Sequence, residues 1–274
     1  MPEYICSTCG TEYESSVQPP AACSICQDER QYVPQEGQRW TLMPDLQGRH
    51  RNRLTELEAG LVEVVTEPAF AIGQRALLVQ TPHGNLLWDC LTMIDLETVT
   101  ALNGLGGVDV MAISHPHFYG AVASWATALD CPRVLLPAAD REHLMHRHPS
   151  IVHFDEVEMS PLEGLRLIRV GGHFLGSTVL HWPGGAGGRG VLLSGDSIAV
   201  VADRRHVTFL YSYPNRIPLA AADVRMIAQR CRPLAFDRLY SGFSDGLIAS
   251  GAHAAVLRSA ERYVGMLEGN WPRL

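Results

Sequence analysis

The amino-acid sequence predicts an α/β protein, a four-layer αββα sandwich preceded by a small four-cysteine module. Three observations predict this class. Apolar strand-like runs alternate with helix-like runs in two successive halves of the chain, His or Asp follows several of these runs directly, and four cysteines lie within the first 26 residues. With 274 residues, the chain is long enough for one large domain and one small module.

The first half shows five short runs rich in apolar and β-branched residues, which are typical of strands. These strands are expected at 61–66, 75–80, 85–90, 108–114 and 133–136. Three stretches with helical spacing alternate with them. These helices are expected at 96–105, 119–129 and 140–147. Gly106 and Gly107 end the first helix, because glycine readily terminates helices.

The second half repeats the pattern and ends in two helices. Its strands are expected at 165–170, 178–182, 191–194, 206–210 and 237–241, and its helices at 219–230 and 253–267. The glycine-rich stretch 184–190 is predicted to be a hairpin turn, because it lacks the Lys-Ser/Thr pair of a phosphate-binding loop. Two β-rich halves, each followed by helices, fit an αββα sandwich with ligands at strand ends on one edge.

Composition and charge exclude several classes of protein. The formal net charge of −7, without a basic stripe, argues against a nucleic-acid partner. The N-terminal residues lack the charged and apolar regions of a signal peptide, and no apolar run approaches the roughly 18 residues of a membrane span. We therefore expect a cytoplasmic protein that acts on a small-molecule substrate and has no membrane partner.

The N-terminal cysteines form two knuckles, Cys6-x-x-Cys9 and Cys23-x-x-Cys26. This spacing predicts a tetrahedral four-thiolate metal site. The segment resembles zinc ribbons and rubredoxins, but its second knuckle lacks the Pro and Gly usual in rubredoxins, which favours structural zinc over iron. A disulfide pair is disfavoured in a chain without a signal peptide.

The resulting domain organisation is a zinc ribbon at 1–36 and a larger domain at 37–274. A ribbon of this size buries too little apolar surface to fold alone, so metal binding would supply the missing free energy. Residues 34–52 are expected to be a linker, and the basic run 49–53 a solvated surface. The ribbon is also the candidate surface for docking another protein or for homo-oligomerisation. Cys90, Cys131 and Cys231 lie in apolar surroundings and are expected to be small buried residues.

The stretch His115-Pro116-His117-Phe118-Tyr119-Gly120 directly follows the apolar run 108–114. Two imidazoles on a short, stiff loop after a buried strand can converge on one metal ion. The stretch resembles the His-x-His-x-Asp-His motif of the metallo-β-lactamase superfamily. Tyr119 stands at the Asp position of that motif and Gly120 at the final His position, and neither is a usual ligand of divalent metals.

Further elements of the same superfamily follow in the same order, so the resemblance covers about residues 60–245. Gly172-His173-x-x-Gly176-Ser177 resembles the element that supplies a third His, and the strand ending in Asp196 resembles the element that supplies the metal-bridging Asp. Asp89 matches an Asp that does not bind the metal but orients the loop that carries the His ligands. Phe243 aligns with the last His of the family.

The resemblance implies a single metal held by His115, His117, His173 and Asp196. Tyr119, Gly120 and Phe243 would replace the family residues that bind only the second metal. A metal-free relative, in which the same histidines are ordinary polar residues of a cleft, is the alternative. His143, His146 and His148 also cluster, but their charged surroundings favour a solvated surface.

The principal functional hypothesis is a hydrolase of an ester, thioester or lactone that uses one zinc ion. Zinc lowers the pKa of a bound water to about 7 and polarises an acyl oxygen. Asp196 would bind the metal or act as a base, and Tyr119 would donate a hydrogen bond to a developing oxyanion or fill the vacated second site. The aromatic stretch 209–215 would wall the cleft or pack at a strand end.

Two alternatives remain open from the sequence. A non-haem iron oxygenase similar to the persulfide dioxygenases of the superfamily would hold Fe²⁺ with His115, His173 and Asp196. A non-catalytic protein would use the larger domain to bind a ligand or partner. Phosphodiester cleavage is disfavoured, because nucleases of the superfamily clamp the phosphate with two metals and this surface is acidic.

Overall fold

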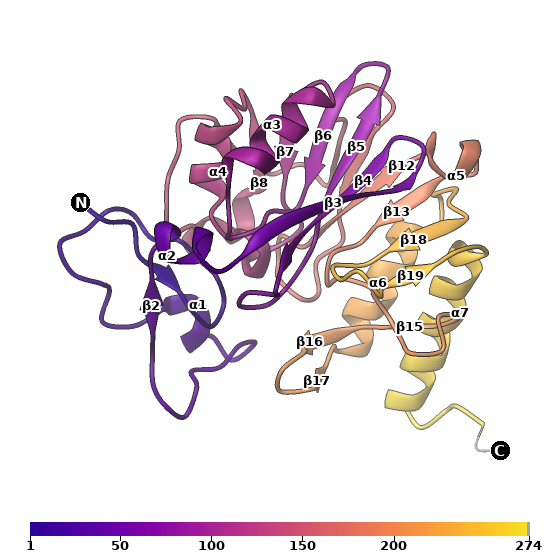
Figure 1. The fold of residues 1–274 in the computed structure, drawn as a ribbon. Helices are drawn as coiled ribbons and strands as arrows, with labels where there is room; N and C mark the ends of the chain where they lie inside the picture. The colour runs from indigo at the N-terminus through magenta and orange to yellow at the C-terminus, as the bar shows by residue number, and fades with distance from the viewer. Residues whose placement is uncertain (273–274) are drawn as a thin grey trace. The chain divides into compact units, whose positions relative to one another are not determined.

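The computed structural model describes residues 1–272, which form two compact units. The first comprises Met1–Asp155 and the second begins at Glu156. Each unit contains its own mixed sheet with helices, as the alternating sequence pattern predicts (Figure 1). Among the described residues, no helix is both long enough and apolar enough to cross a lipid bilayer.

The first unit is built on a seven-stranded sheet whose strands pair in the order in which they occur along the chain. They are β3 (Arg51–Glu58), β4 (Leu61–Glu67), β5 (Ala76–Thr81), β6 (Gly84–Trp88), β7 (Val110–Ala112), β8 (Val134–Pro137) and β9 (Ile151–Phe154). Strands β3 to β6 form an antiparallel meander, whereas β6 to β9 are parallel. Because parallel strands end at the same edge of a sheet, the segments after β6, β7 and β8 gather there.

The central strands of this sheet are almost entirely buried, which explains their continuous apolar sequences. The helical segments are α3 (Leu96–Gly104), η1 (Pro116–Phe118), α4 (Val122–Ala128) and η2 (Ala138–His143), of which η1 and η2 are 3₁₀ helices. Helix α3 begins where the Asp95 carboxylate accepts a 2.6 Å hydrogen bond from the Thr98 N–H.

The N-terminal segment belongs to the same unit. It contains β1 (Ile5–Cys6), α1 (Ser24–Gln27), β2 (Trp40–Thr41) and α2 (Met43–Gln47). Strand β1 pairs with β2, and Ile5 packs in one cluster with Leu46 and Met93. The expectation of a linker at 34–52 is therefore wrong, because that stretch contains β2, α2 and the start of β3.

The second unit has a six-stranded sheet, antiparallel except between β13 and β18. In spatial order its strands are β10 (Glu158–Met159), β11 (Arg166–Arg169), β12 (Thr178–Trp182), β13 (Val191–Leu193), β18 (Arg238–Tyr240) and β19 (Leu247–Ile248). The short stretch α5 (Gly185–Gly188) joins β12 to β13, which confirms the predicted hairpin turn.

Two helices, α6 (Ala221–Cys231) and α7 (Ala252–Leu267), pack beside this sheet (Figure 1). Val224 and Ile227 of α6 and Val256 of α7 share one buried cluster with Leu192 and Leu239 of the strands. Two small hairpins complete the unit, β14 (Ala199–Val200) with β15 (Val207–Thr208) and β16 (Leu210–Ser212) with β17 (Ile217–Pro218).

Several expected elements differ from the structure. The helix expected at 140–147 is the shorter 3₁₀ helix η2, interrupted by a non-helical Asp140. The helix expected at 119–129 begins only at Val122, because Gly120 adopts a left-handed φ of +48° that ends the preceding turn. The sequence does not predict strand β3, which is rich in polar and charged residues, nor the short strands β9 and β10.

Candidate metal centres

The four N-terminal cysteines converge on one point. Their sulfur atoms all lie within 4.8 Å of one another, and the Cys6–Cys26 and Cys9–Cys23 pairs are each 3.5 Å apart. Sulfurs bound at 2.3 Å to one tetrahedral zinc would be separated by about 3.8 Å. All seven cysteines of the chain lie among the described residues and are free and buried. The arrangement can therefore hold a metal ion.

Polar side chains around this cluster point at the sulfur atoms. The Gln38 amide donates to Cys6 Sγ at 3.1 Å, and the Tyr13 hydroxyl donates to Cys23 Sγ at 3.3 Å. The Thr11 hydroxyl lies 3.3 Å from Cys9 Sγ. The hydrogen bonds that Gln38 and Tyr13 donate to sulfur stabilise thiolates and orient metal ligands. The residues that support the ribbon thus extend beyond residue 36, to Gln38 and strand β2.

The ribbon is joined by hydrogen bonds to the segment after β6 and to the loop that carries His115 and His117. The Thr92 hydroxyl donates to the Gly10 carbonyl at 2.8 Å, and the Glu12 N–H donates to the Gly120 carbonyl at 3.0 Å. A Cβ atom at Gly10 would lie 2.2 Å from Thr92 Oγ1, so only glycine allows this close approach.

Glu12 anchors the same contact with its side chain, which is 1% exposed. Its carboxylate accepts hydrogen bonds from the Ser124 hydroxyl at 2.7 and 2.9 Å, and from the His146 ring nitrogen Nδ1 at 2.7 Å. A buried carboxylate is costly unless it is hydrogen-bonded and paired, and Glu12 has both kinds of partner. The ribbon is therefore a specifically docked part of the first unit.

His115 and His117 lie at the end of β7, where the topology brings parallel strand ends together. They are 0% and 2% exposed, and their ring centroids are 5.3 Å apart. The Ser114 hydroxyl lies 2.8 Å from His115 Nδ1, and the Phe118 ring packs 4.3 Å from the His115 ring. With Nδ1 engaged by Ser114, Nε2 is the nitrogen of His115 suited to bind a metal.

Asp89 follows β6 and fixes the backbone of this loop. Its Oδ1 atom accepts a 2.7 Å hydrogen bond from the Ser114 N–H, and its own N–H donates to the Ala112 carbonyl. Burial raises the pKa of Asp89 to about 7, against the opposing effects of the Ser114 hydrogen bond and the Arg75 charge. Asp89 also has a φ of +63°, rare for a residue other than glycine.

The two residues that replace family ligands in this loop differ in the space around them: Tyr119 has a buried side chain, whereas Gly120 has no room for one. Tyr119 is 1% exposed, and its hydroxyl has no hydrogen-bond partner among the described residues. Burial and the charge of Asp140 raise its pKa well above the ordinary value, which keeps the phenol protonated. At Gly120 a Cβ atom would lie 2.7 Å from the Leu91 carbonyl oxygen, so the backbone closes this position to any side chain.

His173 occupies a tight turn after β11 in the second unit and is 0% exposed. Gly172, with a φ of +85°, lies so close to α6 that a Cβ atom would approach Ile227 to 3.0 Å. The His173 Nδ1 lies 3.1 Å from the Leu210 carbonyl oxygen. Because a carbonyl only accepts, Nδ1 carries the proton and Nε2 has the lone pair that a metal requires.

Asp196 follows β13 and is 5% exposed. The Tyr213 hydroxyl donates to its backbone carbonyl at 2.7 Å, while the Tyr213 ring lies edge-on to His173 with the centroids 5.6 Å apart. Tyr213 thus contacts both candidate ligands of this unit. The sequence marked the aromatic stretch 209–215 but gave this residue no role, because its two partners are distant along the chain.

The other aromatic residues of that stretch serve packing. Phe209 is buried in the core of the second unit, and residues 210–218 form the β16–β17 hairpin. Phe243 lies in a tight turn after β18, in which the Gly246 N–H donates to its carbonyl. The structure thus gives Phe243 a position after a strand end, as the alignment with the family requires.

The histidines at 143, 146 and 148 have separate partners and do not converge on one ion. His143 lies 3.8 Å from the Glu142 carboxylate, His146 binds Glu12, and His148 Nδ1 accepts from the Ser150 N–H. The expectation of a solvated surface is wrong for His143 and His146, whose side chains are only 18% and 19% exposed.

Cys90, Cys131 and Cys231 are buried, as predicted. Burial raises the pKa of all three thiols, to about 12 for Cys231. A nucleophilic thiolate is therefore disfavoured at each of these positions.

The chain is similar to a curated protein over nearly its whole length, and to solved structures over about three quarters of it. No protein-family model matches the chain. It is 46% identical over 272 residues, covering 97% of each chain, to the uncharacterized protein YmaE of Bacillus subtilis (strain 168).

Among solved structures, VMB-1 superposes with a TM-score of 0.59 at 12% identity, covering 79% of this chain and 98% of that one. The metallo-β-lactamase SMB-1 gives 0.53 at 16% identity, with coverages of 77% and 93%. A B3 metallo-β-lactamase with an active-site glutamic acid gives 0.52 at 18% identity, with coverages of 76% and 86%. These likenesses confirm the predicted metallo-β-lactamase fold.

Proposed function

The chain belongs to the family of Bacillus subtilis YmaE, and we propose that it is a metal-dependent hydrolase that holds one catalytic ion with His115, His117, His173 and Asp196. The observation that carries the proposal is the burial, position and hydrogen bonding of these four side chains. All four are buried, each lies just after a strand of a metallo-β-lactamase fold, and His115 and His173 both have Nδ1 engaged by a neighbour.

The donor set suits a borderline divalent metal. Three neutral imidazoles and one carboxylate are typical ligands of zinc. A bound zinc ion would supply Lewis-acid polarisation of an acyl group and of the attacking water. We propose zinc for the four-cysteine site as well, where its role is structural.

The protein's own residues would perform the remaining steps. Tyr119 would donate a hydrogen bond to a developing oxyanion or to a leaving group, and its buried phenol stays protonated for this role. Asp196 would accept a proton from the attacking water or bind the ion, and Tyr213 holds its backbone in place.

An ester, thioester or lactone is the substrate class that fits these groups. Hydrolysis of an acyl bond can proceed with one electrophilic ion and a donor to the oxyanion, whereas phosphodiester cleavage by two-metal enzymes uses a second ion. Tyr119, Gly120 and Phe243 stand where ligands of that ion would be required, and Gly120 has no space for a side chain. Leu175, two residues after His173, is 80% exposed and offers an apolar contact for an acyl chain.

The proposal is tested by assaying zinc-loaded protein with p-nitrophenyl butyrate, a butyryl thioester and γ-butyrolactone. We expect turnover of at least one substrate to fall by about 100-fold or more in His115→Ala, in line with the loss of a catalytic metal ligand. His83→Ala is the matched control, because His83 is an exposed histidine in the turn between β5 and β6. Equal turnover in wild type and His115→Ala would refute metal-assisted hydrolysis.

Elemental analysis of the full chain separates this proposal from its alternatives. We expect two zinc ions per chain in the wild type and one in Cys9→Ser. A cysteine variant is preferable to truncation near residue 38, because β1 and β2 pair across that point. Iron in place of the second zinc, with oxygen uptake on glutathione persulfide, would favour the oxygenase. Absence of a metal other than that of the ribbon would favour a non-catalytic binding protein.

A further inference from the structure

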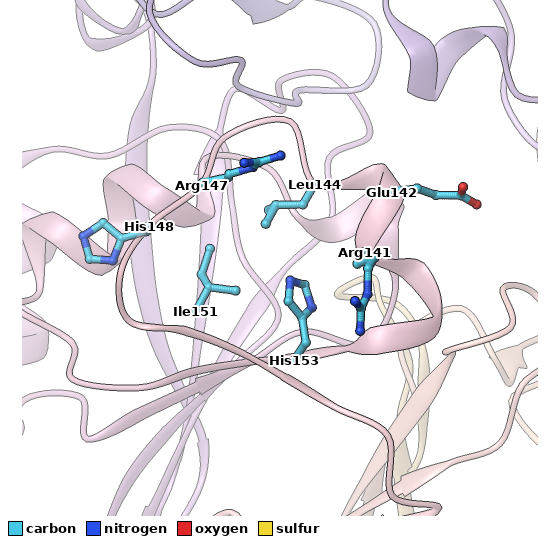
Figure 2. A pocket seen from close by; sticks show the side chains of 7 residues that line it. All are labelled: Arg141, Glu142, Leu144, Arg147, His148, Ile151 and His153. Atoms are coloured by element: carbon cyan, nitrogen blue, oxygen red, sulfur yellow. The ribbon is translucent and has the colours of Figure 1, made fainter.

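A hollow of about 460 Å³ on the first unit is lined by none of the residues assigned above to either metal. It is formed by η2, the turn that follows it and strand β9. Seven residues line it: Arg141, Glu142, Leu144, Arg147, His148, Ile151 and His153 (Figure 2). Its volume falls within the range of about 300–1,000 Å³ typical of small-molecule sites.

Positive charge is concentrated in this hollow. Two guanidinium groups and two imidazoles line it, although the whole chain carries a formal charge of −7. Glu142 is the one acidic residue in the lining, and its side chain is 80% exposed and points away from the hollow in Figure 2. The net field inside therefore favours an anion.

Local hydrogen bonds hold several of these groups in place. The Arg141 Nε–H donates to the Ala138 carbonyl at 3.1 Å, which fixes the guanidinium at the rim and leaves its terminal nitrogens for a ligand. The Ser150 N–H donates to His148 Nδ1 at 3.2 Å, so a neutral His148 carries its proton on Nε2, where it can donate.

Arg141 and His153 lie close to each other at one side of the hollow (Figure 2). Burial lowers the pKa of His153 and the Arg141 charge lowers it further, against the weaker effect of Asp155 on the same strand end. Both effects favour the neutral imidazole, and an anion bound between Arg141 and His153 would offset them and favour the protonated, charged form of His153. This arrangement is typical of anion sites.

The floor of the hollow is apolar. Leu144 and Ile151 are half-buried, and in Figure 2 they lie between the charged groups. A simple inorganic anion would occupy only a small part of the volume and would leave these side chains uncovered. A ligand that combines an anionic group with an apolar body would cover both kinds of surface.

We propose that this hollow binds a small organic phosphate monoester, with the phosphate between Arg141, Arg147 and His153 and the organic part against Leu144 and Ile151. A phosphate presents three oxygens and about two negative charges to donors on several sides, and arginine forks match it well. A carboxylate presents two oxygens in one plane and would use fewer of these donors. The hollow contains none of the four proposed catalytic ligands, so the site is independent of the hydrolase proposal.

Binding can be tested on full-length, zinc-loaded protein by NMR, observing the Cε1–H signals of His148 and His153. The probes are phenyl phosphate, inorganic phosphate and benzoate. We expect phenyl phosphate to shift both signals and to bind at least about fivefold more tightly than either other probe. Arg141→Gln and Arg147→Gln should each weaken phenyl phosphate binding by about tenfold. Arg205→Gln, at an exposed arginine of the second unit, is the matched control and should bind as wild type.

Two further variants locate the ligand. Leu144→Ala should weaken binding of phenyl phosphate and leave that of inorganic phosphate unchanged, because only the organic part contacts the apolar floor. His115→Ala should leave the dissociation constant unchanged. Phenyl phosphate binding that depends on His115 and leaves the His148 and His153 signals unmoved would overturn the proposal, as would tighter binding of benzoate or an unaltered affinity in Arg141→Gln.

Discussion

Gly120 provides the sharpest test of how the backbone closes one position of the His loop to a side chain. In the metallo-β-lactamase motif its position belongs to a histidine, but here its φ is +48° and the position faces the backbone of Leu91. A Cβ atom would lie 2.7 Å from the Leu91 carbonyl oxygen and 2.9 Å from the carbonyl carbon. Gly120→Ala therefore combines an unfavourable backbone conformation with a steric clash.

The expected destabilisation follows from these two contributions. A left-handed conformation costs a residue with a Cβ atom about 1–2 kcal/mol, and forcing an extra methyl group into a packed region costs about 1–3 kcal/mol. We expect Gly120→Ala to lower the free energy of unfolding by about 2–5 kcal/mol. Urea unfolding can measure this through the fluorescence of Trp88 and Trp125, which are buried in the same unit.

Two control substitutions in this unit separate the contributions. Gly37 has a positive φ of +87° and Gly104 lies in helix α3, and at neither position would a Cβ atom have a neighbour within 4 Å. Gly37→Ala should cost about 1–2 kcal/mol, whereas Gly104→Ala should be neutral or stabilising by up to about 1 kcal/mol. If Gly120→Ala costs no more than Gly37→Ala, the close approach to Leu91 does not restrict this position and the reasoning is refuted.

Four further predictions concern the ribbon and its contact with the His loop. Glu12→Gln should destabilise the first unit by about 1.5–3 kcal/mol in urea unfolding, because a charged hydrogen bond to a buried partner is lost. The hydrogen bond from Glu12 raises the pKa of His146 above 6.5, so its stabilising effect should be complete below that pH and should decline as the pH rises through the folded-state pKa; unfolding of wild type and His146→Gln at a series of pH values measures the difference. Cys9→Ser should remove one metal ion per chain and make the ribbon sensitive to limited proteolysis. Asp89→Ala should weaken zinc binding by the catalytic site about 10- to 100-fold in a chelator competition, because Ser114 loses its carboxylate partner.

Each of these predictions has a contrary outcome. A constant difference between wild type and His146→Gln across the pH series would show that the pairing with Glu12 does not depend on protonation of His146. Unchanged stability of Glu12→Gln would show that the carboxylate charge contributes nothing to docking. Full metal content in Cys9→Ser would mean that three thiolates suffice, and unaltered zinc affinity in Asp89→Ala would make Asp89 a purely structural residue.

The contact between ribbon and His loop also bears on what the ribbon does. Gly10 and Glu12 lie between the two cysteine knuckles and bind Thr92, Gly120 and Ser124 through hydrogen bonds. The ribbon therefore holds the backbone of the loop that carries His115 and His117, at Gly120.

The sequence by itself determined the class of fold, the four-cysteine site and the candidate catalytic ligands, because each depends on local patterns. Apolar runs give strands at nearly the observed positions, as at β12, where 178–182 matches residue for residue. Cysteine knuckles and His-x-His bring their ligands together within a few residues, so spacing alone indicates a metal. The exclusion of Gly120 as a ligand also followed from its residue type.

Only the tertiary structure decided which distant residues support these groups. Tyr213 binds the Asp196 carbonyl, Leu210 fixes the His173 tautomer, and Glu12 joins His146 across a sequence separation of 134 residues. Such pairs leave no periodic signal, because the atoms that meet are set by sheet order and helix packing. The steric closure at Gly120 also depends on a tertiary contact, because the Leu91 backbone lies close to it. The residue type alone does not reveal this contact.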